Sequence, residues 1–390
     1  MKKIQIYTAL WNVDTKIAER GRPANALRNF TPMGRYNLLD YVVREAWLDM
    51  VERRMANFET MLAQHIDWLY LFVAPEYYFA ASDSAHAIPQ NAKQTIVGML
   101  QVLSGRFSNL VLVPGTIAWK KPVLRRGPEV FQRNTTNLKE RGRMEKFLER
   151  SKTAIDDHAA LIPHAVDLWI ADRVRDADGD RSEIRRLQGP DYRRVRTQIL
   201  EDELDLRRQA TSRMITNLQQ QQDRCYIARN TAYAFRAGRE VARYHKRGDY
   251  FEVFPSESDN GYVIYEPGGG PEGPGDRFTV ESVKFGVEVC LDHQLGFLSQ
   301  HGGYYPDVQV IMSAAAQFIP DHAFVTHGGY IVHASSESDN TAIYFNDRGR
   351  IRNVATTNVP TLVGELRYAT LELEVNDGPV IIDDYTGNNV

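Results

Sequence analysis

The chain has 390 residues, of which 43% are hydrophobic and 25% are charged, as in a globular protein with a sizeable core. Its net charge of −3 gives no general attraction to nucleic acid or anionic membranes, so we expect neither as a partner. Cys225 and Cys290 are too few for a disulfide framework and favour a reducing, cytoplasmic location. No apolar run approaches the roughly 20 residues that span a bilayer, and the interrupted apolar start predicts no signal peptide.

The first third of the sequence alternates between strand-like and helix-like segments. Residues 4–9 predict a strand, and residues 38–66 carry apolar side chains at helical spacing. A continuous apolar run at 69–74, ended by Pro75, is typical of a buried strand. A second helix is expected at 91–103 and a further strand at 110–114. This alternation predicts an α/β fold built in layers.

The segment at 121–224 breaks this pattern. It holds 22 Lys and Arg and 18 Asp and Glu residues, and it contains few strand-like runs. We interpret it as a mostly helical insertion into a single domain that spans residues 1–390. Such a segment can be a solvated excursion without chemistry. The segment begins just after the predicted end of a strand, where α/β folds usually build their pockets. It could therefore also form a lid, a pocket wall or an oligomer surface.

The layered pattern resumes at Cys225. Two β-rich runs at 225–235 and 240–244 flank a glycine and predict a hairpin. A second hairpin is expected from 341–345 and 350–354, around Asp347-Arg-Gly. Pro and Gly punctuate 266–275, which predicts a loop. Further strands are expected at 261–265, 308–312, 330–334 and 362–373.

Three residues that could share one reaction follow predicted strands. Glu76 follows the strand at 69–74, Lys246 follows the run at 240–244, and Cys290 ends a strand-like run at 283–289. A thiol must lose its proton to attack a carbonyl carbon, a carboxylate can accept that proton, and an ammonium can stabilise the oxyanion. Taken singly, each also fits a structural role as a buried cysteine, a turn carboxylate or a solvated lysine. We expect Cys225 to be a core residue.

The motifs around these residues resemble those of the carbon–nitrogen hydrolase (nitrilase) superfamily. The matching pieces occur in the family's order and cover the chain except 121–224. They are Pro-Glu-aromatic at 75–77, Asn-Thr-Ala at 230–232, Tyr-x-Lys at 244–246, Gly-Val-x-x-Cys at 286–290 with Leu291-Asp292 behind it, and a strand with small residues at 308–316.

The resemblance implies a four-layer αββα sandwich and a homodimer or larger homo-oligomer. It also implies catalytic roles for Glu76 as the base, Lys246 as the oxyanion stabiliser and Cys290 as the nucleophile. The backbone N–H of Leu291 is expected to be a second oxyanion donor. The family often has a supporting glutamate after its lysine, and of Glu252 and Glu257 we favour Glu252. Residues expected to line the substrate pocket are Tyr77, Tyr78, Trp119 and His293.

The residues after the cysteine bear on the substrate. Leu291-Asp292 is closer to the Cys-x-Asp pattern of amide- and carbamoyl-cleaving members than to the Trp-Glu of nitrilases. We therefore expect an amidase or carbamoylase that hydrolyses a linear amide or an N-carbamoyl compound. Nitrile hydrolysis, acyl or amide transfer on the same triad, and a non-catalytic interaction protein remain open. We expect no cofactor and no metal, because the histidines lack the spacing of a metal site.

Overall fold

The computed structural model describes most of the chain outside the charged segment at 121–224. The chain forms two compact units: the first contains Met1–Trp119, Arg229–Arg247 and Gly268–Val390, and the second contains Lys120–Ala228 and Gly248–Pro267. The described residues are 2–15, 27, 30–81, 87–122, 193–198, 200–202, 205, 209, 225–247, 256–258, 261–265, 268, 275–300 and 305–375. Most of the expected insertion therefore lies outside the described residues.

The first sheet of the first unit is mixed. Its central strands β1 (Lys2–Asn12), β2 (Asp67–Val73) and β4 (Leu110–Val113) run parallel, while β17 (Glu365–Val375) pairs antiparallel with β1. Strand β4 and residues 69–73 of β2 are continuous buried apolar runs, as expected for strands that are covered on both faces. The order of the described strands is β16 (Thr357–Pro360), β17, β1, β2, β4, β6 (Cys225–Arg236), β5 (Thr116–Pro122) and β3 (Ile88–Pro89), with β7 (Arg239–His245) paired to β6.

The second sheet has three parallel strands at its centre. These are β11 (Val283–Val289), β12 (Val308–Ser313) and β13 (Tyr330–Ser335). Because β11 and β12 are parallel neighbours, the residues that follow them, Cys290 and Ala314, emerge at the same edge of the sheet. Antiparallel strands complete the described sheet: β10 (Arg277–Val280) on one side, and β14 (Ala342–Asp347) and β15 (Arg350–Val354) on the other.

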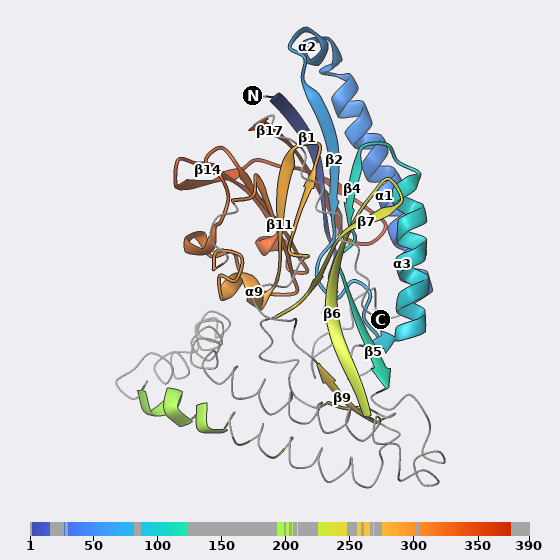
Figure 1. Ribbon diagram of the computed structural model, residues 1–390, viewed down its shortest axis with the longest axis vertical. Coiled ribbons are helices and arrows are strands. Elements are labelled where there is room, and N and C mark those ends of the chain that lie inside the picture. The colour runs from blue at the N-terminus through green and yellow to red at the C-terminus, as the bar shows by residue number, and fades with distance from the viewer. Residues whose placement is uncertain are drawn as a thin grey trace. The chain divides into compact units, whose positions relative to one another are not determined.

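Figure 1 shows the two sheets of the first unit face to face, with α1 (Pro32–Met55) and α3 (Gln90–Gly105) on the outer side of the first sheet. Leu71, Val287 and Val310 belong to the apolar core between the sheets. A second core joins the helices to the outer face of the first sheet and includes Leu39, Leu100 and Phe72. The remaining described helices of the first unit are α2 (Phe58–Ala63), α9 (Leu291–Gln294), η3 (Pro320–His322) and η4 (Ser338–Asn340).

The α/β class is confirmed, but the fourth layer of the expected αββα sandwich is not. On the outer face of the second sheet, Ile311 and Ile331 pack against Phe318, Ala323 and Val325. These last residues come from the segments on either side of the short helix η3, between β12 and β13. In the described part of the chain, short segments thus cover the face where long helices were expected.

In the second unit, the structure describes a small part of the chain. Strand β9 (Gly261–Tyr265) pairs in parallel with the first residues of β6 and antiparallel with β8 (Ser256–Ser258). Helical residues are described at 193–198 and 200–202.

Both predicted hairpins are confirmed. The β6–β7 turn has Ala237 and Gly238 at φ of +50° and +78°, and the β14–β15 turn has Arg348 and Gly349 at +55° and +91°. Two successive residues with positive φ match the right-handed twist of the flanking strands. The single helix expected at 38–66 is wrong, because the structure forms α1 and α2 with a break at 56–57.

Candidate active site

Glu76 lies in a tight turn directly after β2. Pro75 cannot extend the strand ladder, and Tyr77 takes a φ of +58°, which turns the chain sharply. The Tyr77 N–H donates to Thr116 Oγ1 at 2.8 Å, and the buried Arg35 donates from Nη1 to the Tyr78 carbonyl at 2.9 Å. These bonds hold the backbone of the turn and therefore the direction of the Glu76 side chain.

Gly115 allows this turn to approach β5. Its φ is +80°, and an added Cβ would lie 2.2 Å from the Pro75 carbonyl oxygen and 2.9 Å from Tyr78 Cβ. We expect Gly115→Ala to lower the free energy of unfolding by roughly 2–4 kcal/mol, from strain and clash together, and to displace Glu76. Gly98→Ala is the matched control, because Gly98 lies in α3 with no atom within 4 Å of an added Cβ. Urea unfolding of both variants checks this prediction, and equal stability of the two would contradict it.

The Glu76 carboxylate is fully buried and accepts three hydrogen bonds. Lys246 Nζ donates to Oε1 at 2.9 Å and Asn230 Nδ2 donates to the same oxygen at 2.9 Å. The backbone N–H of Ala314 donates to Oε2 at 3.1 Å. A buried carboxylate needs such compensation to stay charged. The donors come from three distant segments, so the fold, and not local sequence, builds this site.

Lys246 follows β7 and is itself 7% exposed. Its backbone N–H donates to the Asn230 carbonyl at 2.9 Å, and its carbonyl accepts from the Gly268 N–H at 2.9 Å. The ammonium forms an ion pair with Glu76 and lies 5.7 Å from the centre of the Tyr77 ring. Backbone bonds on both sides of Lys246 therefore fix a side chain that carries a positive charge beside the carboxylate.

Cys290 occupies a strained corner between β11 and α9. Its φ is +52° and its ψ is −106°, a region that non-glycine residues rarely adopt. The Cys290 N–H donates to the Met312 carbonyl at 2.8 Å, which anchors the corner to the neighbouring strand. The half-buried thiol lies close enough to the Glu76 carboxylate, the Lys246 ammonium and the Ala314 N–H for all three to shift its pKa.

The surroundings of Cys290 keep its proton on sulfur. Burial, followed by the Glu76 charge, raises the pKa of the Cys290 thiol to about 12, although Lys246 acts in the opposite direction. At neutral pH the thiol is therefore protonated and faces a carboxylate that can accept its proton. This arrangement suits a nucleophile that loses its proton at the moment of attack. It does not suit one that is already a thiolate in the resting protein.

Asp292 links the segment that carries Cys290 to the segment that carries Lys246. Its buried carboxylate accepts from Tyr244 Oη at 2.7 Å and from the Arg247 N–H at 3.1 Å. Burial, followed by the neighbouring Asp292 charge, raises the pKa of Tyr244 well above its usual value, so the phenol remains a donor. Two bonds thus hold the end of β7 against the start of α9.

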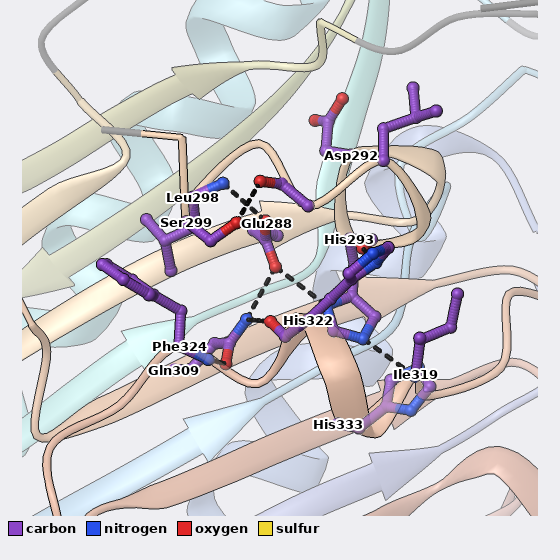
Figure 2. Close-up of polar contacts among 12 residues, drawn as sticks. Glu288, Asp292, His293, Leu298, Ser299, Gln309, Ile319, His322, Phe324 and His333 are labelled. Atoms are coloured by element: carbon purple, nitrogen blue, oxygen red, sulfur yellow. Dashed lines mark hydrogen bonds and ion pairs between the residues drawn. The ribbon is translucent and has the colours of Figure 1, made fainter. Parts of the chain in front are cut away.

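A second buried network supports the segments around the thiol. Figure 2 shows contacts converging on the Glu288 carboxylate from His293 Nδ1 at 2.9 Å, the Leu298 N–H at 2.8 Å and Gln309 Nε2 at 2.7 Å. His293 Nε2 accepts from the Ile319 N–H at 3.0 Å. The network therefore ties α9 to β12 and to the loop that begins at Ala314.

Glu288→Gln tests this network. An amide in place of the carboxylate would replace one acceptor oxygen with an NH2 group that faces other donors, so we expect a loss of about 1–3 kcal/mol of unfolding free energy. Glu281→Gln is the control, because Glu281 is an exposed residue paired with Arg236, and it should change stability by about 1 kcal/mol at most. Chemical denaturation of both variants measures the difference. A Glu288→Gln variant as stable as Glu281→Gln would contradict the proposed support.

The structure gives the expected pocket residues different surroundings. His293 is fully buried, and both of its ring nitrogens are bonded within the protein. Tyr78 is also buried in the core, where its ring lies 5.0 Å from that of Trp11. Tyr77 is half-buried beside Lys246. Trp119 is 6% exposed and donates from Nε1 to Thr231 Oγ1 at 2.9 Å.

The structure describes the expected supporting residues only in part. Leu291 is the first residue of α9, directly after the thiol. Glu252, the expected supporting glutamate, lies outside the described residues. Glu257 lies in β8, but its side chain is not among those described.

Sequence reasoning missed two donors to the Glu76 carboxylate. Asn230 stood in a recognised motif, but nothing in its spacing indicated that its amide would reach Glu76. Ala314 contributes a backbone N–H, which no side-chain pattern can reveal. The parallel pairing of β11 and β12 is the signal that places Ala314 beside Cys290.

Among the described residues, no group of three or more His, Cys, Asp or Glu side chains is arranged to hold a metal ion. In the same part of the chain, every helix is too short or too polar to cross a bilayer.

Comparisons with known proteins give a limited result. No family model matches the chain, and no curated protein matches it. Among solved structures, the chain is similar to a glutamine-dependent NAD(+) synthetase from Cytophaga hutchinsonii, with a TM-score of 0.38 and 9% sequence identity over 95% of this chain and 43% of that chain. The chain thus spans less than half of that synthetase, and a likeness at this level assigns no family.

Proposed function

We propose that this chain is a hydrolase that cleaves a non-peptide C–N bond through a thioester on Cys290. One observation carries the proposal: the Cys290 thiol, the Glu76 carboxylate, the Lys246 ammonium and the Ala314 N–H meet in one place. A structural cysteine needs none of these partners. Glu76 and Lys246 are buried, and buried ionisable groups of this kind cluster at functional sites.

In the first half of the reaction, the sulfur attacks the carbonyl carbon while Glu76 accepts the thiol proton. The carbonyl electron pair moves to oxygen, and Lys246 and the Leu291 N–H stabilise the oxyanion. When the tetrahedral intermediate collapses, the C–N bond breaks and Glu76 gives its proton to the leaving nitrogen. The products of this half are a free amine or ammonia and a thioester on Cys290.

In the second half, Glu76 removes a proton from water, and the resulting hydroxide attacks the thioester carbon. The new intermediate collapses with loss of the Cys290 sulfur, which recovers a proton from Glu76. The net reaction consumes one amide and one water and gives one acid and one amine. Lys246 keeps its proton throughout, because its role is to hold negative charge on the substrate oxygen.

The proposed substrate is a linear amide or an N-carbamoyl compound. This choice rests on Leu291-Asp292 behind the cysteine, which resembles the pattern of amide- and carbamoyl-cleaving members of the nitrilase superfamily. Under this proposal the αββα sandwich of that family would be the parent fold. The short segments over the second sheet would then replace its outer helices.

A substrate panel tests the proposal. The purified chain is incubated with linear amides, N-carbamoyl compounds and nitriles, and the released ammonia or amine is measured beside a Cys290→Ser control. We expect turnover of an amide or carbamoyl compound by the native chain and none by the control. Added hydroxylamine separates hydrolysis from acyl transfer, because a transferase would form hydroxamate in preference to acid. Equal product from the native chain and from Cys290→Ser would overturn the proposal.

A further inference from the structure

Thr15 is a buried residue whose hydroxyl bonds to the backbone of Glu76. It follows β1 and is 2% exposed, and its Oγ1 donates to the Glu76 carbonyl at 2.5 Å. The other end of the same peptide unit, the Tyr77 N–H, donates to Thr116 Oγ1 at 2.8 Å. Because a peptide unit is planar, bonds at its two ends fix its orientation. They therefore fix the backbone conformation from which the Glu76 side chain extends.

Ser336 extends this contact to the second sheet. It directly follows β13 and is 6% exposed, and its Oγ is in hydrogen-bond contact with Thr15 Oγ1. A carbonyl can only accept, so the hydroxyl hydrogen of Thr15 is committed to Glu76. Ser336 must then be the donor to Thr15. The two hydroxyls thus form a directed chain that runs from Ser336 through Thr15 to the Glu76 carbonyl.

The chain closes on the carboxylate of the same glutamate. The Ser336 N–H donates to the Ser313 carbonyl at 3.1 Å, and the next residue, Ala314, donates its N–H to Glu76 Oε2 at 3.1 Å. Glu76 follows β2 of the first sheet, yet its backbone and its carboxylate are both tied to the ends of β12 and β13 in the second. The N–H of Cys290 is also bonded to β12, so the acid and the thiol share one anchor.

From these observations we infer that Thr15 and Ser336 are positioning residues of the candidate active site, whose hydroxyl chain sets the place of the Glu76 carboxylate relative to the Cys290 sulfur. Their role is to hold Glu76 and not to exchange protons with a substrate, because the hydrogen of Thr15 is committed to a carbonyl. This inference deepens the proposed hydrolase function and rests on Glu76 as its base.

Thr15→Val tests the role in turnover. Valine keeps the shape of the side chain but removes the hydroxyl, so the peptide unit after Glu76 is held at one end only. With the substrate that the panel identifies, we expect kcat to fall about 10–100-fold and KM to stay within about threefold, because the base is misplaced while the pocket is kept. Thr15→Ser retains the hydroxyl and should restore kcat. Thr8→Val is the matched control, since Thr8 is a fully buried residue of β1 whose hydroxyl donates to the Ile6 carbonyl at 3.5 Å.

Alkylation of Cys290 with iodoacetamide tests the same role without any substrate. The Glu76 charge is one of the causes that raise the pKa of this thiol, so a carboxylate that moves away should leave more thiolate. At neutral pH we expect alkylation about three- to tenfold faster in Thr15→Val and about two- to threefold faster in Ser336→Ala. Ser104→Ala is the control and should match the native rate. Ser104 is fully buried, and its hydroxyl bonds to the Gln101 carbonyl and the Gly238 N–H, away from the site.

A Glu76→Gln background separates positioning from a general loosening of the site. Without a carboxylate charge to displace, Thr15→Val or Ser336→Ala should add less than about twofold to the alkylation rate. Equal acceleration in the native and Glu76→Gln backgrounds would overturn the inference, as would native alkylation rates in both hydroxyl variants. Ser336→Ala carries the comparison if Thr15→Val does not fold. A native chain that turns over no compound of the panel would refute the hydrolase proposal alone, because the alkylation rates still decide the positioning role.

Discussion

Glu76→Gln is expected to stop hydrolysis while it makes the Cys290 thiol more reactive toward alkylation. Loss of the general base should reduce turnover by about 10²–10⁴-fold. The carboxylate charge is also one of the causes that raise the pKa of Cys290 to about 12, and Lys246 is a cause that lowers it. Without the carboxylate, Lys246 keeps the thiolate as its anionic neighbour, and the pKa of Cys290 should fall.

The pH dependence of alkylation shows the sign of this effect. Only the thiolate reacts, so the native chain should react slowly at neutral pH and faster with every step toward pH 12. The curve for Glu76→Gln should move to lower pH, with about tenfold more thiolate at neutral pH for each unit by which the pKa falls. Iodoacetamide rates measured by intact mass give both curves, and Cys290→Ser supplies the background from Cys225. If iodoacetamide reacts more slowly with Glu76→Gln than with the native chain, the assignment of the proton to the Cys290 sulfur and of the negative charge to Glu76 is wrong.

Lys246→Met is expected to have the largest effect on stability. It leaves the Glu76 carboxylate buried without its ammonium partner, and breaking a buried pair in this way lowers stability by about 3–5 kcal/mol. Lys2→Met is the matched control, because Lys2 pairs with Asp67 at the surface at 2.6 Å, and such a pair contributes about 0–1 kcal/mol. Urea unfolding compares the two variants.

The same lysine variant should change the thiol in the direction opposite to Glu76→Gln. Lys246 lowers the pKa of Cys290, so Lys246→Met should raise it and slow alkylation. Hydrolysis should also be lost, because nothing would replace the ammonium at the oxyanion. If Lys246→Met and Glu76→Gln shift alkylation in the same direction, the electrostatic account of the site is wrong.

The parts of the site that sequence predicted are those that follow strands. Glu76, Lys246 and Cys290 each come directly after a run with strong β character, and strand ends are where layered folds collect side chains. The structure brings these three residues together. Both hairpins were also predicted from the local sequence, because Gly238 and Gly349 adopt a positive φ, which few other residues adopt without strain.

Other parts depend on long-range packing and could not be predicted. Helical spacing of apolar residues continues from α1 into α2, so the break at Ala56 and Asn57 could not be predicted from the pattern. His293 follows the nucleophile closely, yet its direction depends on Glu288 and on the Ile319 N–H, which lies 26 residues later. The segments that cover the outer face of the second sheet are likewise loops. No periodic pattern in a sequence predicts the path of a loop.

The most direct test of the account is peptide mapping of a reaction that is quenched with acid during turnover. The thioester should be stable enough at low pH to be isolated, and we expect the acyl group of the substrate on the peptide that contains Cys290. The adduct should be absent in Cys290→Ser and should disappear from the native chain as water completes the reaction. Turnover without an acyl group on Cys290, or with one on another residue, would contradict the account.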